Sequence, residues 1–164
     1  MKRYFALFLA LSLLLSGCGF FTEHIKEPVT FYYLRSEFQY FSQDAVFASE
    51  EREASGHRDD LSYLMALYLM GPAEEELLSP IPRGTRIYKT EETASGITLY
   101  LSDTAATMDD MEYSLACTCL SLTCLDLTDA AFVTITSGNR SITMNRNTLT
   151  LFDGSTAASG EETK

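Results

Sequence analysis

The segment from Asp109 to about Leu125 most constrains the fold, because it reads as a helix with two apolar sides. Asp109 and Glu112 have the spacing of a capping box, which predicts that the helix begins there. On a helical wheel, one apolar stripe contains Met111, Leu115, Thr118, Leu122 and Leu125. The opposite stripe contains Tyr113, Cys117, Leu120 and Cys124. A helix that is apolar on two sides must be buried on two sides.

One side of this helix is expected to pack on a sheet. The other side is expected to face either a C-terminal hairpin or a partner subunit. The sequence therefore marks the second stripe, Tyr113, Cys117, Leu120 and Cys124, as a candidate interaction surface.

A first helix and a first strand precede this segment. Val29–Leu34 is rich in β-branched and aromatic residues on both faces, which predicts a strand inside a sheet. Apolar residues recur at helical spacing from Leu61 to Tyr68, after a capping Asp59 or Asp60. Gly71-Pro72 is expected to end that helix. Between strand and helix, Glu50, Glu51 and Glu53 with Gly56 are expected to form a solvated turn.

The remaining elements are mostly strands. Arg86–Thr90 and Ile97–Leu101 predict a hairpin, and Ala131–Thr136 predicts a strand. A weaker hairpin is expected from Ile142 to Leu151, with its turn at Asn145-Arg146-Asn147. The core order is then β-α-β-β-α-β, which predicts an α+β two-layer sandwich. In it, a mixed sheet of about four core strands is covered by two helices, with a C-terminal hairpin added.

The N-terminus carries an export pattern. Lys2 and Arg3 precede an apolar run of twelve residues, Tyr4 to Leu15, interrupted only by Ser12. This run is too short to span a bilayer, which needs ~20 residues, and it fits a secretory signal peptide. The string Leu15-Ser16-Gly17-Cys18 resembles the bacterial lipobox, in which the cysteine receives a diacylglyceryl group before cleavage. The predicted division is a lipoprotein signal peptide at 1–17, a lipidated tether at 18–27, a domain at 28–152 and a disordered tail at 153–164.

Charge and composition exclude several functions. The chain has 12 Lys and Arg residues against 23 Asp and Glu, a formal net charge of −11. Such acidity argues against nucleic-acid binding, which needs cations that neutralise phosphates. Only 2 histidines are present, His24 in the tether and His57 before the first helix. Neither lies in a recognisable nucleophile–base pattern, and no Gly-x-Ser-x-Gly turn or phosphate-binding loop occurs. We therefore expect no catalytic residues and no cofactor.

The helical cysteines are expected to be packing residues. Cys119 points about 160° away from Cys117 on the helix, so one helix cannot direct Cys117, Cys119 and Cys124 to a single metal. Cys117 and Cys124 are ~10 Å apart along the axis, beyond the ~7 Å limit for a disulfide. Removing Cys18 leaves an odd number, which also argues against a disulfide framework. The acidic residues around Asp103 and Asp110 lack the EF-hand pattern, and we expect no metal site.

Two motifs and the strand between the helices resemble a known family. Leu64–Met70 ends in Gly71-Pro72 and is followed by Ile81-Pro82-Arg83-Gly84-Thr85. Gly96–Ser102 then precedes the second helix, and Tyr32-Tyr33-Leu34 stands at the start. Together these strings resemble the GerMN domain of bacterial sporulation and spore-germination lipoproteins, over about residues 28–152. The resemblance implies a binding or scaffolding module without catalytic residues. The founding members carry two such domains in tandem, and this chain has room for one.

The sequence thus predicts a lipoprotein anchored through Cys18 at the outer face of the cell membrane, acting by protein contact in sporulation, germination or envelope assembly. Its partners would be envelope or sporulation proteins, or further copies of this chain. A first alternative is a small-ligand-binding lipoprotein in which the aromatic segment Phe31–Phe41 lines a groove. A second is a cell-wall hydrolase, which would need a perturbed carboxylate or histidine in a cleft.

Overall fold

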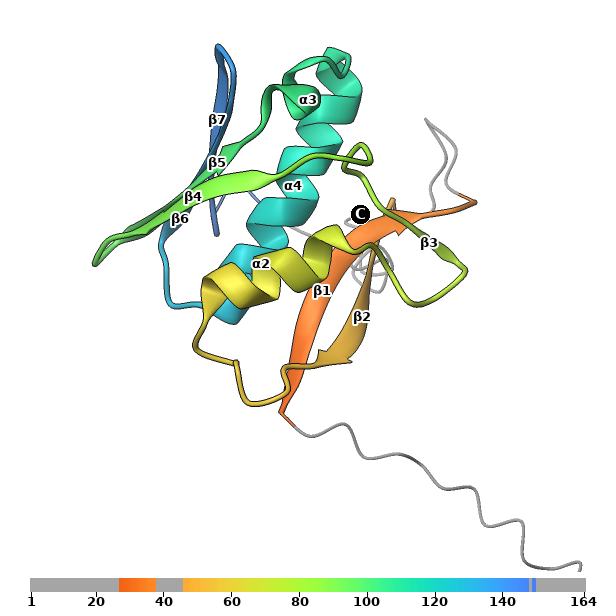
Figure 1. The fold of residues 1–164 in the computed structure, drawn as a ribbon, viewed down its shortest axis with the longest axis vertical. Helices are drawn as coiled ribbons and strands as arrows, with labels where there is room; N and C mark the ends of the chain where they lie inside the picture. The colour runs from red at the N-terminus through yellow and green to blue at the C-terminus, as the bar shows by residue number, and fades with distance from the viewer. Residues whose placement is uncertain (1–26, 38–45, 148, 150–164) are drawn as a thin grey trace, which may run out of the picture.

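The computed structural model describes residues 27–37, 46–147 and 149 (Figure 1). Its elements follow the chain in this order: β1 (Pro28–Arg35), β2 (Phe47–Glu53), α2 (Leu61–Leu69), β3 (Leu77–Leu78), β4 (Ile87–Glu92), β5 (Gly96–Leu101), α3 (Asp103–Ala106), α4 (Asp110–Leu127), β6 (Phe132–Ser137) and β7 (Arg140–Asn145). The predicted helices and the strands β1, β4, β5 and β6 are confirmed. Cys18 and the predicted tail at 153–164 lie outside the described residues.

The strands form two sheets. The smaller has the order β2-β1-β3 and is antiparallel, and the larger has the order β4-β5-β6-β7. In the larger sheet β5 and β6 are parallel, because α3 and α4 form the crossover between them. The predicted α+β class, with strands layered against helices, is confirmed. The sequence predicts β1 in the same sheet as β4, β5 and β6, whereas in the structure β1 pairs with β2 and β3 in a separate sheet.

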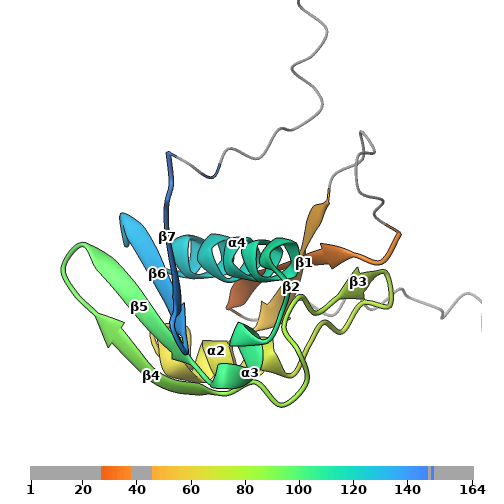
Figure 2. The ribbon, with the colours of Figure 1, turned by 90° about the horizontal axis from the view of Figure 1, so that it is seen from above.

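Helix α4 lies between the two sheets (Figure 2). It packs against β1 on one side and against β6 and β7 on the other. On the β1 side, the Thr123 hydroxyl accepts a hydrogen bond from the Tyr32 amide at 3.0 Å. The capping box of Asp109 and Glu112 is present at its start, as predicted. The chain's own two sheets thus bury α4 on two sides, but the first apolar stripe is buried only toward the C-terminal end of the helix: Leu122 and Leu125 are 8% and 4% exposed, whereas Met111 is 53% exposed.

Tyr68 of α2 joins that helix to β1. Its ring stacks on Tyr33 with centroids 4.7 Å apart and meets the edge of Phe31 at 5.8 Å. Its hydroxyl donates to the Tyr32 carbonyl at 3.0 Å, and its own carbonyl accepts from the Tyr33 hydroxyl at 3.1 Å. Every polar atom of this buried aromatic group therefore has a partner, which fixes the position of α2 on the smaller sheet.

The glutamate-rich segment was predicted wrongly as a solvated turn. Glu50 lies in β2 and is only 3% exposed. Its carboxylate pairs with Arg52 at 2.9 Å and accepts hydrogen bonds from the amides of Ala73 and Glu74, at 2.9 and 3.2 Å. Arg52 also donates to the Gly71 carbonyl at 3.2 Å. The pair therefore holds the loop after α2 against β2, and Gly71 (φ +89°) makes the left-handed turn into that loop.

The C-terminal region differs from prediction in its hairpin. β7 pairs antiparallel with β6 through a tight turn, with Ser137 opposite Arg140 and Gly138 at φ +56°. Ile142 and Met144 are therefore in the outer strand of this hairpin instead of starting a separate one. Leu149 packs against the core, and Leu151 lies outside the described residues.

Candidate binding groove between α2 and β4

The four residues that the sequence marked for interaction are inside the folded chain. Tyr113, Cys117, Leu120 and Cys124 are each at most 1% exposed and belong to the common core. Arg140 of β7 lies 3.9 Å over the Tyr113 ring, and the Cys124 sulfur is 3.6 Å from the sulfur of Met65. As a correction to the interaction surface expected there, this stripe is covered by the chain's own elements and offers no surface for a partner.

The thiols of α4 are held in an unreactive form. Cys117, Cys119 and Cys124 are free and buried, as the packing interpretation predicted. Burial raises the pKa of the Cys117 thiol to about 11 and that of the Cys124 thiol to about 12. Burial also raises the pKa of Cys119. All three thiols therefore remain protonated at neutral pH. They are unreactive in this form, because the thiolate is the reactive species.

The aromatic segment of the ligand-binding alternative is largely core. Phe31 and Tyr33 are fully buried against Tyr68 and line no groove. Phe38, Tyr40 and Phe41 lie outside the described residues. His57 is exposed and stacks on Tyr63 with ring centroids 4.2 Å apart, as expected for a surface residue.

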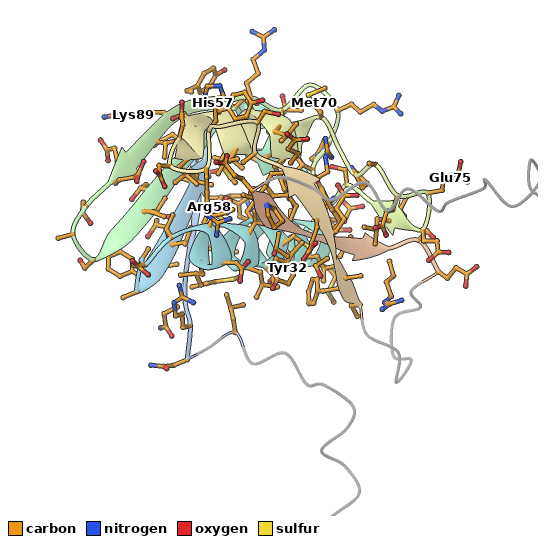
Figure 3. The ribbon with its side chains drawn as sticks, turned by 90° about the horizontal axis from the view of Figure 1, so that it is seen from below. Tyr32, His57, Arg58, Met70, Glu75 and Lys89 are labelled. Carbon is orange, nitrogen blue, oxygen red and sulfur yellow. The ribbon has the colours of Figure 1, made fainter. Side chains whose placement is uncertain are left out.

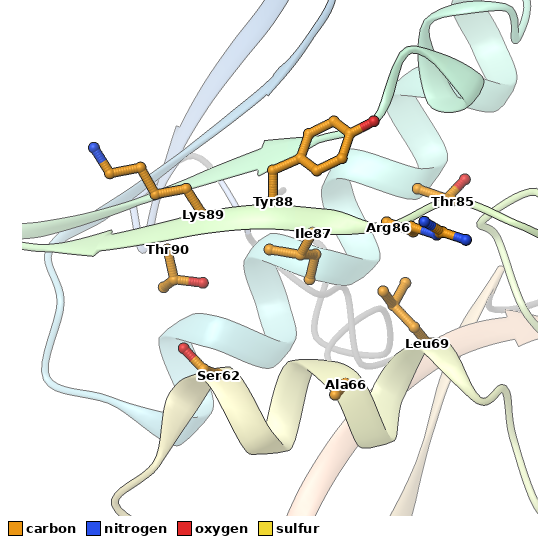
Figure 4. A pocket seen from close by; sticks show the side chains of 9 residues that line it. All are labelled: Ser62, Ala66, Leu69, Thr85, Arg86, Ile87, Tyr88, Lys89 and Thr90. Atoms are coloured by element: carbon orange, nitrogen blue, oxygen red, sulfur yellow. The ribbon is translucent and has the colours of Figure 1, made fainter.

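A groove of about 510 Å³ separates α2 from β4 (Figure 4). From the helix, Ser62 and Leu69 point toward the strand, and Ala66 lines the groove between them. From the strand, Ile87 and Thr90 point toward the helix. Ser62 and Ala66 are small, so their side chains leave open the volume between them and the side chains of β4. The groove is lined in all by Ser62, Ala66, Leu69, Thr85, Arg86, Ile87, Tyr88, Lys89 and Thr90.

Strand β4 is an edge of the larger sheet, so one side of its backbone has no strand beside it. The bond from the Thr93 amide to the Gly96 carbonyl closes the β4–β5 hairpin at 2.9 Å. Bonded pairs alternate from there, so Glu91 and Lys89 turn their backbone groups toward β5. Thr90 and Glu92 turn theirs to the open side. No backbone group of another described segment bonds to them there.

A β-bulge shapes the outer surface of this edge. The register of β4 against β5 shifts between Ile87 and Lys89. Tyr88 and Lys89 are consequently both exposed, although they are consecutive, and Ile87 and Thr90 on either side both face α2. Tyr88 is 72% exposed and Met70, at the end of α2, is 79% exposed. Figure 3 shows Met70 and Lys89 at the same edge of the molecule, over α2 and β4.

The groove has a cationic end in an acidic protein. The stretch Ile81–Thr90 contains Arg83, Arg86 and Lys89 and no acidic residue, and Glu91 and Glu92 follow it in β4. Of these cations, Arg86 and Lys89 line the groove. Lys89 forms an ion pair with Glu91, and the hydrogen bond that its ammonium donates to that carboxylate raises the Lys89 pKa. Arg83 and Arg86 form no ion pair within the described part of the chain. The backbone of Arg86 is fixed by Ser102, whose amide and hydroxyl bond to it at 2.8 and 3.1 Å.

Sequence reasoning missed this groove. The cation-rich stretch was visible in the sequence and is the one pattern that could have indicated it. The bulge and the packing of α2 beside an edge strand have no local sequence pattern. Within the described residues there is no cluster of three or more His, Cys, Asp or Glu side chains placed to hold a metal. Among the same described residues, no helix is long and apolar enough to cross a bilayer.

Comparison with known proteins gives a fold and no family assignment. No protein-family model and no curated protein sequence matches the chain. Among solved structures, the tandem GerMN domains of the sporulation protein GerM from Bacillus subtilis match with a TM-score of 0.50 and 19% identity. That match covers 69% of this chain and 39% of the tandem-domain chain. A Clostridium perfringens protein described as a candidate lipoprotein matches with a TM-score of 0.47 and 14% identity, over 73% of this chain and 89% of its own. The chain therefore has a GerMN-like fold.

Proposed function

We propose that this chain is a non-enzymatic protein-binding module, anchored at the outer face of the membrane and active in envelope or sporulation assembly. The observation that carries the proposal is the groove between α2 and β4. It combines an unpaired strand edge, exposed Tyr88, and Arg86, which has no ion pair among the described residues. Exposed Met70 directly follows the lining residue Leu69. Exposed aromatic, methionine and arginine side chains are the types enriched in protein interfaces. The GerMN-like fold agrees with this interpretation.

The anchor is inferred from the sequence pattern at Cys18. Two acyl chains on one cysteine bind a bilayer far more stably than a single chain, because each buried methylene contributes ~0.8 kcal/mol. The described fold begins only at residue 27, and Glu27 and Pro28 are held by Gly56 and Arg58. The intervening nine residues, 19–27, reach at most ~30 Å when extended. The domain would thus work close to the membrane surface.

The anchor is tested by Cys18→Ala in the full-length protein. We expect the variant to move from the membrane fraction to the soluble fraction after cell lysis. Metabolic labelling with a radioactive fatty acid should mark the wild-type chain and leave the variant unlabelled. A variant that stays in the membrane fraction would show that the lipobox interpretation is wrong.

The binding function is tested by photocrosslinking in intact cells. A photoreactive phenylalanine analogue replaces Tyr88 or Ser62 at the groove, and Met111 serves as a control, because it is 53% exposed on α4. We expect crosslinks to another protein from the two groove positions and none from Met111. Crosslinks from Met111 alone, or from no position, would contradict the proposal. Release of soluble fragments from purified cell wall by the protein would contradict its non-enzymatic part.

A further inference from the structure

We propose that the groove binds an extended acidic segment of a partner protein, which adds to the free edge of β4 as a fifth strand. The inference rests on the proposed binding function and specifies the partner's conformation and charge. It follows from three independent properties of the groove: its backbone, its space and its charge.

Several backbone amides and carbonyls of β4 have no strand partner on its open side. Thr90 and Glu92 direct their amide and carbonyl groups away from β5, because Lys89 and Glu91 use theirs for the β4–β5 ladder. On the other side of the bulge, Ile87 is opposite Leu101, and the carbonyl of the preceding Arg86 bonds to the Ser102 amide. By the same alternation the amide and carbonyl of Ile87 are also directed to the open side. The edge thus presents main-chain donors and acceptors that only another extended backbone satisfies in register.

The groove leaves room for a strand beside that edge. A strand added to β4 would lie ~4.8 Å from it, over the side of α2 that carries Ser62 and Ala66. Both of these side chains are small and exposed, and they leave the volume of about 510 Å³ open. Alternate side chains of the added strand would enter this volume and contact Leu69 and Ile87. The intervening ones would lie on the outer face beside Tyr88.

The arginine charge at the end of the groove favours an acidic partner. Arg86 lines the groove, is exposed and has no acidic partner among the described residues. Arg83, three residues earlier, is also exposed and unpaired there, whereas the whole chain carries −11. An acidic segment is attracted here and repelled by the rest of the surface, which gives both orientation and specificity. The partner is therefore an acidic segment of another protein.

The test uses the soluble Cys18→Ala protein and a phage-displayed library of random peptides. We expect selected peptides to be enriched in Asp and Glu and to alternate them with apolar residues. The strongest peptide is then synthesised, together with a version N-methylated at alternate residues. Binding should slow hydrogen exchange of the Thr90 and Glu92 amides, and N-methylation of the pairing residues should abolish binding. Arg83→Glu with Arg86→Glu should weaken binding about ten-fold or more.

The matched control is Arg35→Glu, since Arg35 is also exposed and without an ion pair among the residues described. It changes the net charge in the same direction and should leave peptide affinity within about two-fold. Selection of no peptide, or of peptides without acidic enrichment, would overturn the inference. Binding that survives N-methylation, or equal binding of poly(glycerol phosphate), would show that the groove binds polyanions in general and not an added strand. If groove crosslinks persist in cells while these peptide results fail, the binding function stands and this partner does not.

Discussion

The three thiols of α4 make the stability of this protein sensitive to alkaline pH. In the unfolded chain a cysteine has its ordinary pKa of 9.0, whereas burial raises the pKa of Cys117 to about 11 and that of Cys124 to about 12. The pKa of Cys119 is raised by the same cause. Because the folded state keeps protons that the unfolded state loses, this contribution is fully present below pH 9. It is lost as the pH rises from 9 toward the folded pKa values.

The size of the effect follows from the linkage between protonation and folding. At pH 10, each thiol with a folded pKa of 11 or more lowers the free energy of unfolding by roughly 1 kcal/mol relative to pH 7. Three thiols together lower it by roughly 3–4 kcal/mol. A domain of this kind is stable by about 5–15 kcal/mol, so the loss is a large fraction of the total. The buried phenols of Tyr33 and Tyr68, whose ordinary pKa is 10.0, add to the loss at higher pH.

The assay is urea unfolding of the Cys18→Ala protein, followed by far-ultraviolet circular dichroism under reducing conditions between pH 7 and pH 10. The control replaces Cys117, Cys119 and Cys124 by alanine. That variant is less stable at pH 7, but its free energy of unfolding should change little up to pH 9.5. If it does not fold, single alanine variants should each remove about a third of the pH dependence. Parallel pH dependences for wild type and variants would refute the assignment to the thiols.

Three further predictions concern stability at neutral pH. Leu120→Asp should unfold the chain, because it places a charge at a position that is 0% exposed. Circular dichroism of the purified variant tests this, with Asp126→Asn on the exposed side of α4 as the control. Glu50→Gln should lower the free energy of unfolding in urea by about 3 kcal/mol, whereas exposed Glu51→Gln should change it by less than about 0.5 kcal/mol. Gly96→Ala should destabilise by about 1–3 kcal/mol, because the added Cβ would lie 2.3 Å from the Phe132 ring, and a double-mutant cycle with Phe132→Ala should recover most of that loss.

The features that sequence reasoning predicted correctly are those encoded within one or two turns of chain. The Asp60 side chain caps α2 by accepting from the Tyr63 amide at 3.0 Å, and Asp109 and Glu112 bond reciprocally at the start of α4. Each interaction spans only three residues, so spacing alone reveals it. Helical periodicity also identified the buried stripe Tyr113, Cys117, Leu120 and Cys124 of α4, although Met111, assigned to the other apolar stripe, is 53% exposed.

The features that it missed depend on residues far apart in the chain. Nothing local tells β1 to pair with β2 and β3 instead of joining β5, so one sheet was predicted where two form. Glu50 lies in a run of charges, which ordinarily indicates a solvated turn. Its amide partners, Ala73 and Glu74, lie 23 and 24 residues away. The same holds for the α2–β4 groove, which exists because a bulged edge strand lies beside a helix that carries small residues.

The position of the groove relative to the start of the fold bears on how it would work on an anchored chain. Glu27 and Pro28 are held by Gly56 and Arg58, which immediately precede α2. Helix α2 has nine residues and is therefore ~13 Å long, and Leu69 and Arg86 line the groove at its far end. The cationic end of the groove thus lies about one length of α2 from the place where residues 27 and 28 join the fold. On a chain anchored at Cys18, the segment that leads to the anchor therefore joins the domain apart from Arg86, which leaves this arginine available to a protein partner.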